Sequence, residues 1–259
     1  MSHKCPSILV NRRGTLRVHV ASVVHDFQHG QSLPEHLHPE DQLLFASHGV
    51  MTVQTTNGLF VVPPLRAVWI PAGVAHSIAM SGRVSLRTLY FLPGLIRHLP
   101  AICVVLHVSP LLKELMLHAC EFQHLRRDIP IQRRVIDMII DQLNTARAAP
   151  LQLPQPRDPR VLRIATNLLA DPSQQGTLQQ LCEEVGASKR TAQRLFIAET
   201  NMSFAKWRQQ LRLLHALQSL AAGQKVASAA RAAGYNSTSA FIAMFRKQLG
   251  ATPAHYFRD

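Results

Sequence analysis

The sequence predicts a two-domain protein, with an N-terminal β domain followed by two helices and a C-terminal domain made of helices alone. Residues 1 to about 105 are rich in Val, Gly, Pro and His with short alternating stretches, which is typical of β structure. From residue 109 onward the apolar residues recur with helical spacing. Four prolines between residues 150 and 159 exclude a helix or a central strand and predict a linker. The expected segments are therefore 1–105 (β domain), 106–149 (two helices), 150–157 (linker) and 158–259 (helical domain).

The charge balance indicates an anionic partner. The 259 residues include 28 Lys and Arg against 15 Asp and Glu, a formal net charge of +13. Nucleic acid, or less often an acidic membrane surface, fits such a balance. The charge is +6 before residue 158 and +7 from there on, so charge alone does not say which half meets the anion.

Cysteine usage and hydropathy favour a soluble intracellular protein. No apolar run approaches the roughly 20 residues that span a bilayer. No CxxC pair is present, which argues against a disulfide framework or a zinc knuckle. The four cysteines are scattered at Cys5, Cys103, Cys120 and Cys182.

Two amphipathic helices are expected between the β domain and the linker. In the first, Ser109 is a plausible N-cap and Pro110 suits the first helical position. In the second, apolar residues from Ile131 to Leu143, Ile139 among them, form a face wider than one core contact needs. This face packs against the β domain, or serves self-association, or does both. If the face serves self-association, a charged residue substituted for Ile139 would lie in the contact between the two copies.

The C-terminal domain begins with the spacing of a helix-turn-helix. Thr177 and Gln180 form a capping-box pattern, Gly186 ends the short helix that follows, and Ser188 caps the next one. The pattern returns 49 residues later, where Ser237 takes the place of Ser188. Apolar residues stand at the same offsets in both copies, namely Ala192, Leu195 and Phe196 in the first and Phe241, Met244 and Phe245 in the second. Helix stops at Asn201 and Gly250 and caps at Ser203 and Thr252 also match.

A long helix, residues 204–222, is expected between the two copies. At 1.5 Å per residue it would span roughly 28 Å. Successive major-groove turns on one face of DNA lie ~34 Å apart. A rigid connector of this length would present two recognition helices to adjacent grooves.

Residues 158–258 resemble the DNA-binding domain of the AraC/XylS family of bacterial transcription regulators. The matching text is SKRTAQRLF at 188–196 and GYNSTSAFIAMFRKQLGATPAHYFR at 234–258. The resemblance implies that the helices starting at Ser188 and Ser237 enter the major groove. It implies DNA contacts from Ser188, Lys189, Arg190, Gln193 and Arg194 in the first motif, and from Asn236, Thr238, Ser239, Arg246 and Lys247 in the second.

The first helix is expected to dominate base recognition. Arg and Gln suit bidentate contacts with base edges, and the first helix carries both on its outward face. Lys189 would contact a phosphate or remain in solvent. Family members often carry Arg where Ala243 stands, and its absence weakens the case for base reading by the second helix.

The N-terminal domain resembles a cupin-like jelly roll, the sensor domain of the same family. The segments GQSLPEHLHPEDQLLFASHG (30–49) and VWIPAGVAH (68–76) have spacings similar to the two cupin motifs. His36 and His38 share a strand face because they are two residues apart, and His76 would complete the cluster inside the barrel. Gln42 stands where the family has an acidic ligand. The cluster would bind a divalent transition metal ion, or hydrogen-bond an organic effector. Trp69 is expected in the core, and His29 and His48 at the surface.

The sequence thus predicts a cytoplasmic transcription regulator, an activator or a repressor, controlled by a small-molecule or metal effector. Its expected partners are double-stranded promoter DNA and a second copy of the chain, with RNA polymerase a further candidate and no membrane. No residue is assigned a catalytic role. The alternative is a metal-dependent oxygenase or isomerase of the cupin type fused to a DNA-binding tail. A third reading, an architectural DNA binder without a sensor, would leave the histidines unexplained.

Overall fold

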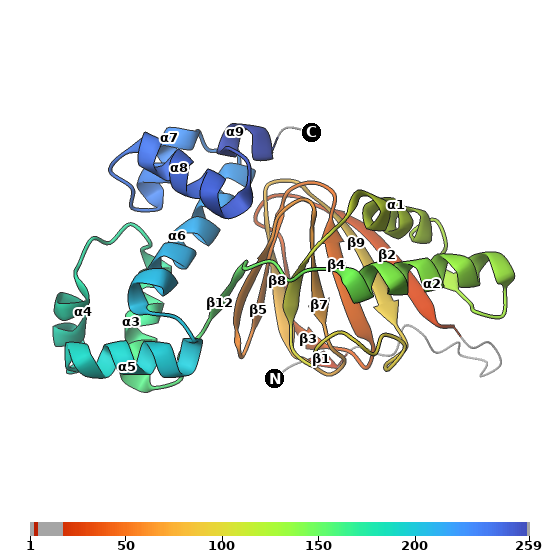
Figure 1. The fold of residues 1–259 in the computed structure, drawn as a ribbon, viewed down its shortest axis with the longest axis horizontal. Coiled ribbons are helices and arrows are strands. Elements are labelled where there is room, and N and C mark those ends of the chain that lie inside the picture. The colour runs from red at the N-terminus through yellow and green to blue at the C-terminus, as the bar shows by residue number, and fades with distance from the viewer. Residues whose placement is uncertain (1–2, 5–17, 258–259) are drawn as a thin grey trace. The chain divides into compact units, whose positions relative to one another are not determined.

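The structure is a computed structural model that describes residues 3–4 and 18–257 (Figure 1). The chain forms two compact units. One consists of Met1–Thr55 and Phe60–Leu151, the other of Thr56–Leu59 and Gln152–Asp259. Cys103 and Cys182 are buried free thiols and Cys120 is partly buried, whereas Cys5 lies outside the described residues.

The first unit is built on two sheets whose strands are mostly antiparallel. The first sheet has the order β1-β3-β8-β5-β6, followed by β12, and the second has the order β10-β7-β4-β9-β2-β11. The strands are β1 (His3–Lys4), β2 (Val20–Phe27), β3 (Ser32–Leu37), β4 (Asp41–Ala46), β5 (Val50–Thr55), β6 (Gly58–Val62), β7 (Arg66–Ile70), β8 (His76–Ser81), β9 (Val84–Phe91), β10 (Val104–His107), β11 (His124–Leu125) and β12 (Gln152–Pro154).

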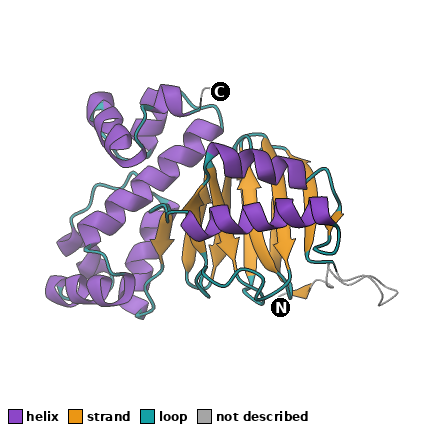
Figure 2. Cartoon of the chain, turned by 45° about the vertical axis from the view of Figure 1, so that its right-hand side comes forward, coloured by secondary structure: helices purple, strands orange, loops and turns teal. Residues whose placement is uncertain are grey.

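The second sheet is covered on one face by the helices α1 (Pro110–Ala119) and α2 (Pro130–Thr145) (Figure 2). Leu43 and Phe45 of β4 join the hydrophobic core beneath these helices. Side chains alternate along a strand, so Gln42 and Leu44 point to the opposite face. Their cross-strand partners are Tyr90 and Thr88 of β9. This inner face carries polar groups and is where the histidines gather.

The predicted cap of α1 is confirmed, and part of the apolar face of α2 packs against the β domain. Ser109 is the N-cap of α1, and its hydroxyl accepts a hydrogen bond from Leu112 N at 3.0 Å. The sequence leaves open whether the apolar face of α2 packs against the β domain, serves self-association or does both, and Ile139, at 1% exposed, packs in the core of its own domain rather than in an association surface. The helical period gave the width of the apolar face but not which flank the sheet covers. Ile131 and Met138 are the large apolar residues of α2 that stay exposed, at 58% and 45%.

Part of the predicted linker is a short strand rather than a free connector. The segment forms β12, next to β6 in the sheet order. Gln155 N donates to Asn57 O at 3.3 Å, and Trp207 Nε1 donates to Pro154 O at 2.8 Å. Proline is tolerated in a strand at a sheet edge, where no ladder donor is needed from it. The proline-rich composition therefore excluded a central strand correctly without excluding this one.

The second unit is helical apart from β12 and the hairpin tip Thr56–Leu59. The helices are α3 (Pro159–Ala170), α4 (Leu178–Glu184), α5 (Lys189–Thr200), α6 (Phe204–Ala221), α7 (Val226–Ala232), α8 (Thr238–Leu249) and α9 (Pro253–Tyr256). Both predicted helix-turn-helix motifs are present, as α4–α5 and α7–α8. The capping box of Thr177 and Gln180 has both of its hydrogen bonds. Asn201 and Gly250 end α5 and α8 in the left-handed conformation, at φ 54° and 83°.

The predicted fold class is thus confirmed as a two-sheet β domain with two helices and an all-α domain with two helix-turn-helix motifs. Local signals account for many of the helix starts, because Ser109, Thr177, Ser188 and Ser237 each cap a helix through a side-chain hydrogen bond. Across the described residues, we find no helix that combines the length and the apolar character needed to cross a membrane.

Candidate functional site

The first recognition helix, α5, is fixed at its start by Ser188. The Ser188 hydroxyl accepts a hydrogen bond from Thr191 N at 3.1 Å and lies 2.9 Å from Thr191 Oγ1. Gly186, at φ 67°, makes the turn from α4. Of the residues predicted in this motif, Ser188 is therefore already engaged as a cap.

The outward face of α5 is basic and free. Ala192, Leu195 and Phe196 are buried, which confirms the predicted inner face. The predicted contact residues Lys189, Arg190, Gln193 and Arg194 are all exposed. Within the described chain, no hydrogen bond or ion pair holds the first three of these side chains. They are available to an external partner, and their donors suit base edges and phosphates.

The second recognition helix, α8, has the same frame and a different surface. Ser237 caps it by accepting from Ala240 N at 3.3 Å, and Phe241 and Phe245 are buried. Its exposed first turns carry the small side chains of Thr238, Ser239 and Ala243, with Asn236 just before the cap. The predicted cations Arg246 and Lys247 are exposed in the last turn.

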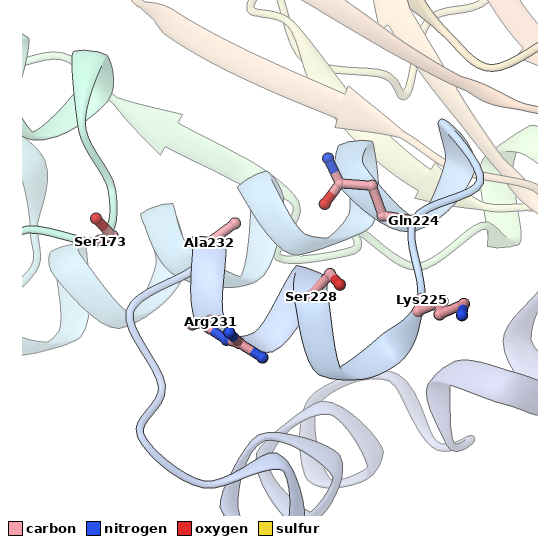
Figure 3. Close-up of a pocket in the computed structure, with 6 residues that line it drawn as sticks. All are labelled: Ser173, Gln224, Lys225, Ser228, Arg231 and Ala232. Atoms are coloured by element: carbon pink, nitrogen blue, oxygen red, sulfur yellow. The ribbon is translucent and has the colours of Figure 1, made fainter.

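A basic pocket beside α7 was missed by the sequence analysis. Lys225 stands at the N-cap of α7, and Ser228 and Arg231 lie on the helix itself (Figure 3). Ser173, Gln224 and Ala232 complete the lining. Two cations and hydroxyl donors at one opening suit phosphate oxygens. The signal was available in the sequence as Lys225 just before the first helix of the second motif and Arg231 on that helix.

Contacts through the loop before α4 connect the two motifs. Gln175 Nε2 donates to Gly234 O at 3.0 Å, which joins this loop to the turn of the second motif. Arg208 of α6 donates to Gly176 O at 2.6 Å and also to Gln174 O. Arg212 of α6 donates to Pro172 O at 3.3 Å and to Gln174 O at 3.2 Å. Half-buried guanidinium groups on α6 thus fix the loop before the first motif against the connector, and Gln175 joins the same loop to the second motif.

The predicted histidine cluster in the β domain is brought together by strand pairing. His36 of β3 and His76 of β8 are register partners, and His38 follows β3 directly. One ring nitrogen from each of the three lies within 4.8 Å of the others. Ring centroids are 4.4 Å apart for His36 and His76 and 5.3 Å apart for His38 and His76. His38 and His76 are buried, and His36 is half-buried.

Backbone carbonyls set the tautomer of all three rings. His36 Nδ1 lies 2.8 Å from Pro34 O, His38 Nδ1 2.9 Å from Glu40 O, and His76 Nδ1 2.9 Å from Val74 O. A carbonyl oxygen can only accept, so each Nδ1 must donate. In the neutral ring, each Nε2 then carries a lone pair.

Burial keeps the cluster uncharged at its centre. Burial, with smaller contributions from His36 and His38, lowers the pKa of His76 to about 4. The His76 ring is therefore neutral near pH 7. Its Nε2 is buried and has no hydrogen-bond partner among the described residues. The Glu40 carboxylate is also buried, with Oε2 4.0 Å from His38 Nδ1.

Polar side chains of the second sheet extend the cluster. Gln42 Oε1 lies 3.2 Å from His38 Nε2, and Gln42 Nε2 donates to Tyr90 Oη at 3.1 Å. The Tyr90 ring stands edge-on to His38, with centroids 5.1 Å apart. Thr88 Oγ1, on the same side of β9, is buried without a hydrogen-bond partner in the described structure. Sequence reasoning missed Tyr90 and Thr88, because only the β4–β9 register places them beside Gln42.

The cluster has the chemistry to hold a metal ion or a polar organic molecule. Imidazole nitrogens suit first-row divalent metals, and a hydrogen bond from Nδ1 to a backbone carbonyl commonly orients such a ring toward a metal ion. The other sequence assignments in this domain are confirmed. Trp69 is 2% exposed in the core, and His29 and His48 are exposed.

Comparisons with known proteins cover both units. Residues 19–155 match the model of the AraC-like ligand binding domain, and residues 181–259 match that of a helix-turn-helix domain. The HTH-type transcriptional regulator NimR of Escherichia coli K12 is 38% identical over 237 residues, which cover 92% of this chain and 86% of NimR. The HTH-type transcriptional regulator RipA of Corynebacterium glutamicum is 35% identical over 117 residues, 45% of this chain and 35% of RipA.

Among solved structures, fatty-acid-bound ToxT from Vibrio cholerae aligns with 92% of this chain and 95% of its own. The sequence identity is 11% and the TM-score is 0.39. Values this low transfer no property from ToxT to this chain.

Proposed function

Because the chain belongs to the AraC family of transcription regulators, we propose that its two helix-turn-helix motifs bind promoter DNA under the control of its ligand-binding domain. The family assignment makes it a transcription regulator with a ligand-binding domain and a DNA-binding domain. The proposal assigns residues to these roles. One observation carries it: Lys189, Arg190 and Gln193 are exposed on α5 and present basic and amide donors that no described hydrogen bond or ion pair engages.

Base reading is assigned to α5. Arg190, Gln193 and Arg194 would contact base edges, and Lys189 a phosphate. In the second motif, Asn236, Thr238 and Ser239 would add weaker contacts, and Arg246 and Lys247 would bind phosphates. The pocket of Lys225 and Arg231 supports the same phosphate role on α7.

Effector binding is assigned to the inner face of the β domain, around His36, His38, Gln42 and His76. Two chemical classes fit there, a polar small molecule and a divalent transition metal ion. No catalytic residue is part of the proposal, and the family findings lend no support to an oxygenase or isomerase. A regulator that meets promoter DNA in bacteria acts in the cytoplasm, and RNA polymerase is a further candidate partner.

The test is an electrophoretic shift of the full-length protein on DNA upstream of its own gene and of neighbouring genes. Binding should be at least about 10³-fold tighter than on scrambled DNA of equal length, the lower end of the usual range for specific binders. Equal affinity for both DNAs across a salt series would show that the protein binds DNA without sequence specificity and would contradict the proposal. Turnover with Fe(II) and oxygen, measured on the same preparation, would instead support the alternative, an oxygenase of the cupin type.

We also propose that the protein is a homodimer that associates through the exposed side of α2. Ile131 and Met138 are seven residues apart on one face and remain uncovered. Met138→Glu should weaken the dimer without unfolding the domain, whereas Ile139→Glu should disrupt the core because it buries a charge. Sedimentation of the full chain at tens of micromolar measures this, with thermal melting as the control. A monomeric wild-type protein would contradict the proposal.

A further inference from the structure

Three basic side chains form a row across one end of the second sheet. His107 of β10 is the register partner of Arg66 of β7. On its other side, His107 N donates to Arg147 O at 2.9 Å, and Leu106 and Ala148 form an antiparallel bridge next to this contact. Residues directly opposite one another in antiparallel strands share a face of the sheet, so the three side chains are neighbours. Like charges in such positions repel each other unless a counter-charge is present.

The described chain supplies no counter-charge for this row. Within it, neither Arg66 nor Arg147 forms an ion pair. The Arg66 guanidinium donates to Leu65 O at 2.8 Å, and its Nε is buried without a hydrogen-bond partner among the described residues. Burial, followed by the charges of Arg66 and Arg147, lowers the pKa of His107. An anion beside this row would therefore meet positive charge that the described residues leave uncompensated.

His107 and Arg147 also line a pocket of about 370 Å³ between β10 and the two helices. Small-molecule sites have volumes of about 300–1,000 Å³ and combine apolar walls with a few polar groups. The buried side chains of Val108 and Leu112 give this pocket its apolar part. Gln142 lines it too, and one end of its amide bonds the Ser109 hydroxyl at 2.7 Å, which leaves the other end for a ligand.

We propose that this pocket binds a small organic anion, whose carboxylate pairs with Arg147 and His107 and whose apolar body packs against Val108 and Leu112. The planar guanidinium matches a carboxylate with two parallel hydrogen bonds. A bare inorganic anion would satisfy the cations but leave the apolar wall uncovered. None of the three clustered histidines of the β domain lines this pocket. The inference therefore goes beyond the proposed function and adds a second ligand site.

The need for a charge is tested by NMR titration of the isotope-labelled full-length protein with benzoate and with benzamide, its uncharged analogue. Benzoate should bind saturably and at least about tenfold more tightly than benzamide, because only the carboxylate makes charge-assisted hydrogen bonds. Equal affinities would overturn the proposal. Inorganic phosphate is the third probe, and binding as tight as that of benzoate would overturn the assignment to an organic anion.

The location is tested by Arg147→Ala, which should weaken benzoate binding by at least about tenfold and leave benzamide binding unchanged. Arg134→Ala is the matched control, since Arg134 is an exposed cation of α2 that does not line the pocket. It should bind benzoate as the wild type does. Equal losses in the two variants, or none in Arg147→Ala, would overturn the site. Circular dichroism confirms that each variant is folded.

His107 supplies a readout that a general loss of positive charge would not change. Arg66 from β7 and Arg147 from the segment after α2 are the charged groups of the described structure that act on its pKa, and α1 contributes none. Saturation with benzoate should raise the pKa of His107, because a carboxylate stabilises the protonated ring.

By linkage, benzoate should bind more tightly as the pH falls from about 7.5 to about 5.5, a range in which carboxylates stay ionised and histidine titrates. His107→Gln should lose this pH dependence while Arg134→Ala keeps it. A His107 pKa that saturating benzoate leaves unchanged, followed through the ring resonances, would overturn the proposal. Promoter DNA takes no part in these titrations, so their failure leaves the DNA-binding proposal untouched.

Discussion

The two helix-turn-helix motifs of this chain share a frame and differ in the surface they present. Ser188 and Ser237 cap the second helix of each motif, and Phe196 and Phe245, at matching positions, are fully buried beneath it. Asn201 and Gly250 end these helices in the same left-handed conformation. The first motif then exposes Lys189, Arg190, Gln193 and Arg194 in the first half of its helix, whereas the second exposes hydroxyls and Ala243 there and cations only in its last turn.

This difference shows that packing and recognition are specified by separate positions of one repeat. Caps and core residues recur because each copy must fold the same way. The outward positions are free of that constraint, so they can differ. We infer that α5 contributes most of the base recognition, that α8 contributes less, and that α6 connects the two motifs. Three predictions test this difference, from the largest expected effect to the smallest.

The largest expected effect concerns the buried core residues that stand at matching positions in the two motifs. Phe196→Ala and Phe245→Ala, at matching positions of the two copies, should each cost about 3–5 kcal/mol of unfolding free energy, because each removes a fully buried aromatic ring. Urea denaturation of the full chain, read from the helical signal, measures both. Ile197→Ala is the control: its side chain is 56% exposed, and its cost should stay near 0.5 kcal/mol or less. A large difference between the two phenylalanine variants would mean that the frames are not equivalent.

The second prediction concerns base recognition by the two recognition helices. Arg190→Ala should lower the affinity for specific DNA by about 1–3 kcal/mol, with a smaller loss on scrambled DNA, if its guanidinium makes a bidentate base contact. Thr238→Ala, in the second helix, should cost less than 1 kcal/mol. Fluorescence anisotropy at two salt concentrations measures, for each variant, the ratio of its affinities for specific and scrambled DNA.

Arg163→Ala controls for the loss of a cation, since Arg163 is exposed on α3 rather than on a recognition helix. It should affect the two DNAs equally. If Thr238→Ala relaxes specificity as much as Arg190→Ala does, the second helix is an equal reader and the comparison fails.

Local signals explain why so much of the helical unit could be predicted from the sequence. A cap, a breaker and a helical stripe act over a few residues, so Thr177, Gly186 and Ser188 could be assigned without knowing the fold. The pair His36 and His38 was accessible for the same reason, because strand alternation is local.

The rest depends on pairing between distant segments. Tyr90 joins Gln42 only through the β4–β9 register, 48 residues apart. The same holds for β12, whose pairing no nearby residue encodes, and for Ile139, whose burial depends on where the sheet lies. Arg208 and Arg212 are one turn apart on α6, yet their carbonyl acceptors lie over 30 residues away.

The smallest effect concerns the glycine turn of each motif. Gly186 and Gly234 both have positive φ, 67° and 78°, so alanine is strained at either position. They differ in surroundings. A Cβ at Gly186 meets nothing within 4 Å, whereas one at Gly234 would come within 2.7 Å of the Arg212 guanidinium.

Gly186→Ala should therefore cost about 1 kcal/mol of unfolding free energy, the ordinary cost of the left-handed conformation for alanine. Gly234→Ala should cost about 1 kcal/mol more, because Arg212 must move and weaken its hydrogen bonds to Pro172 O and Gln174 O. A double-mutant cycle isolates this excess, since in an Arg212→Ala background the two glycine substitutions should cost the same. If the excess persists there, Arg212 is not its source, and the turn of the second motif is constrained by its own backbone rather than by the connector.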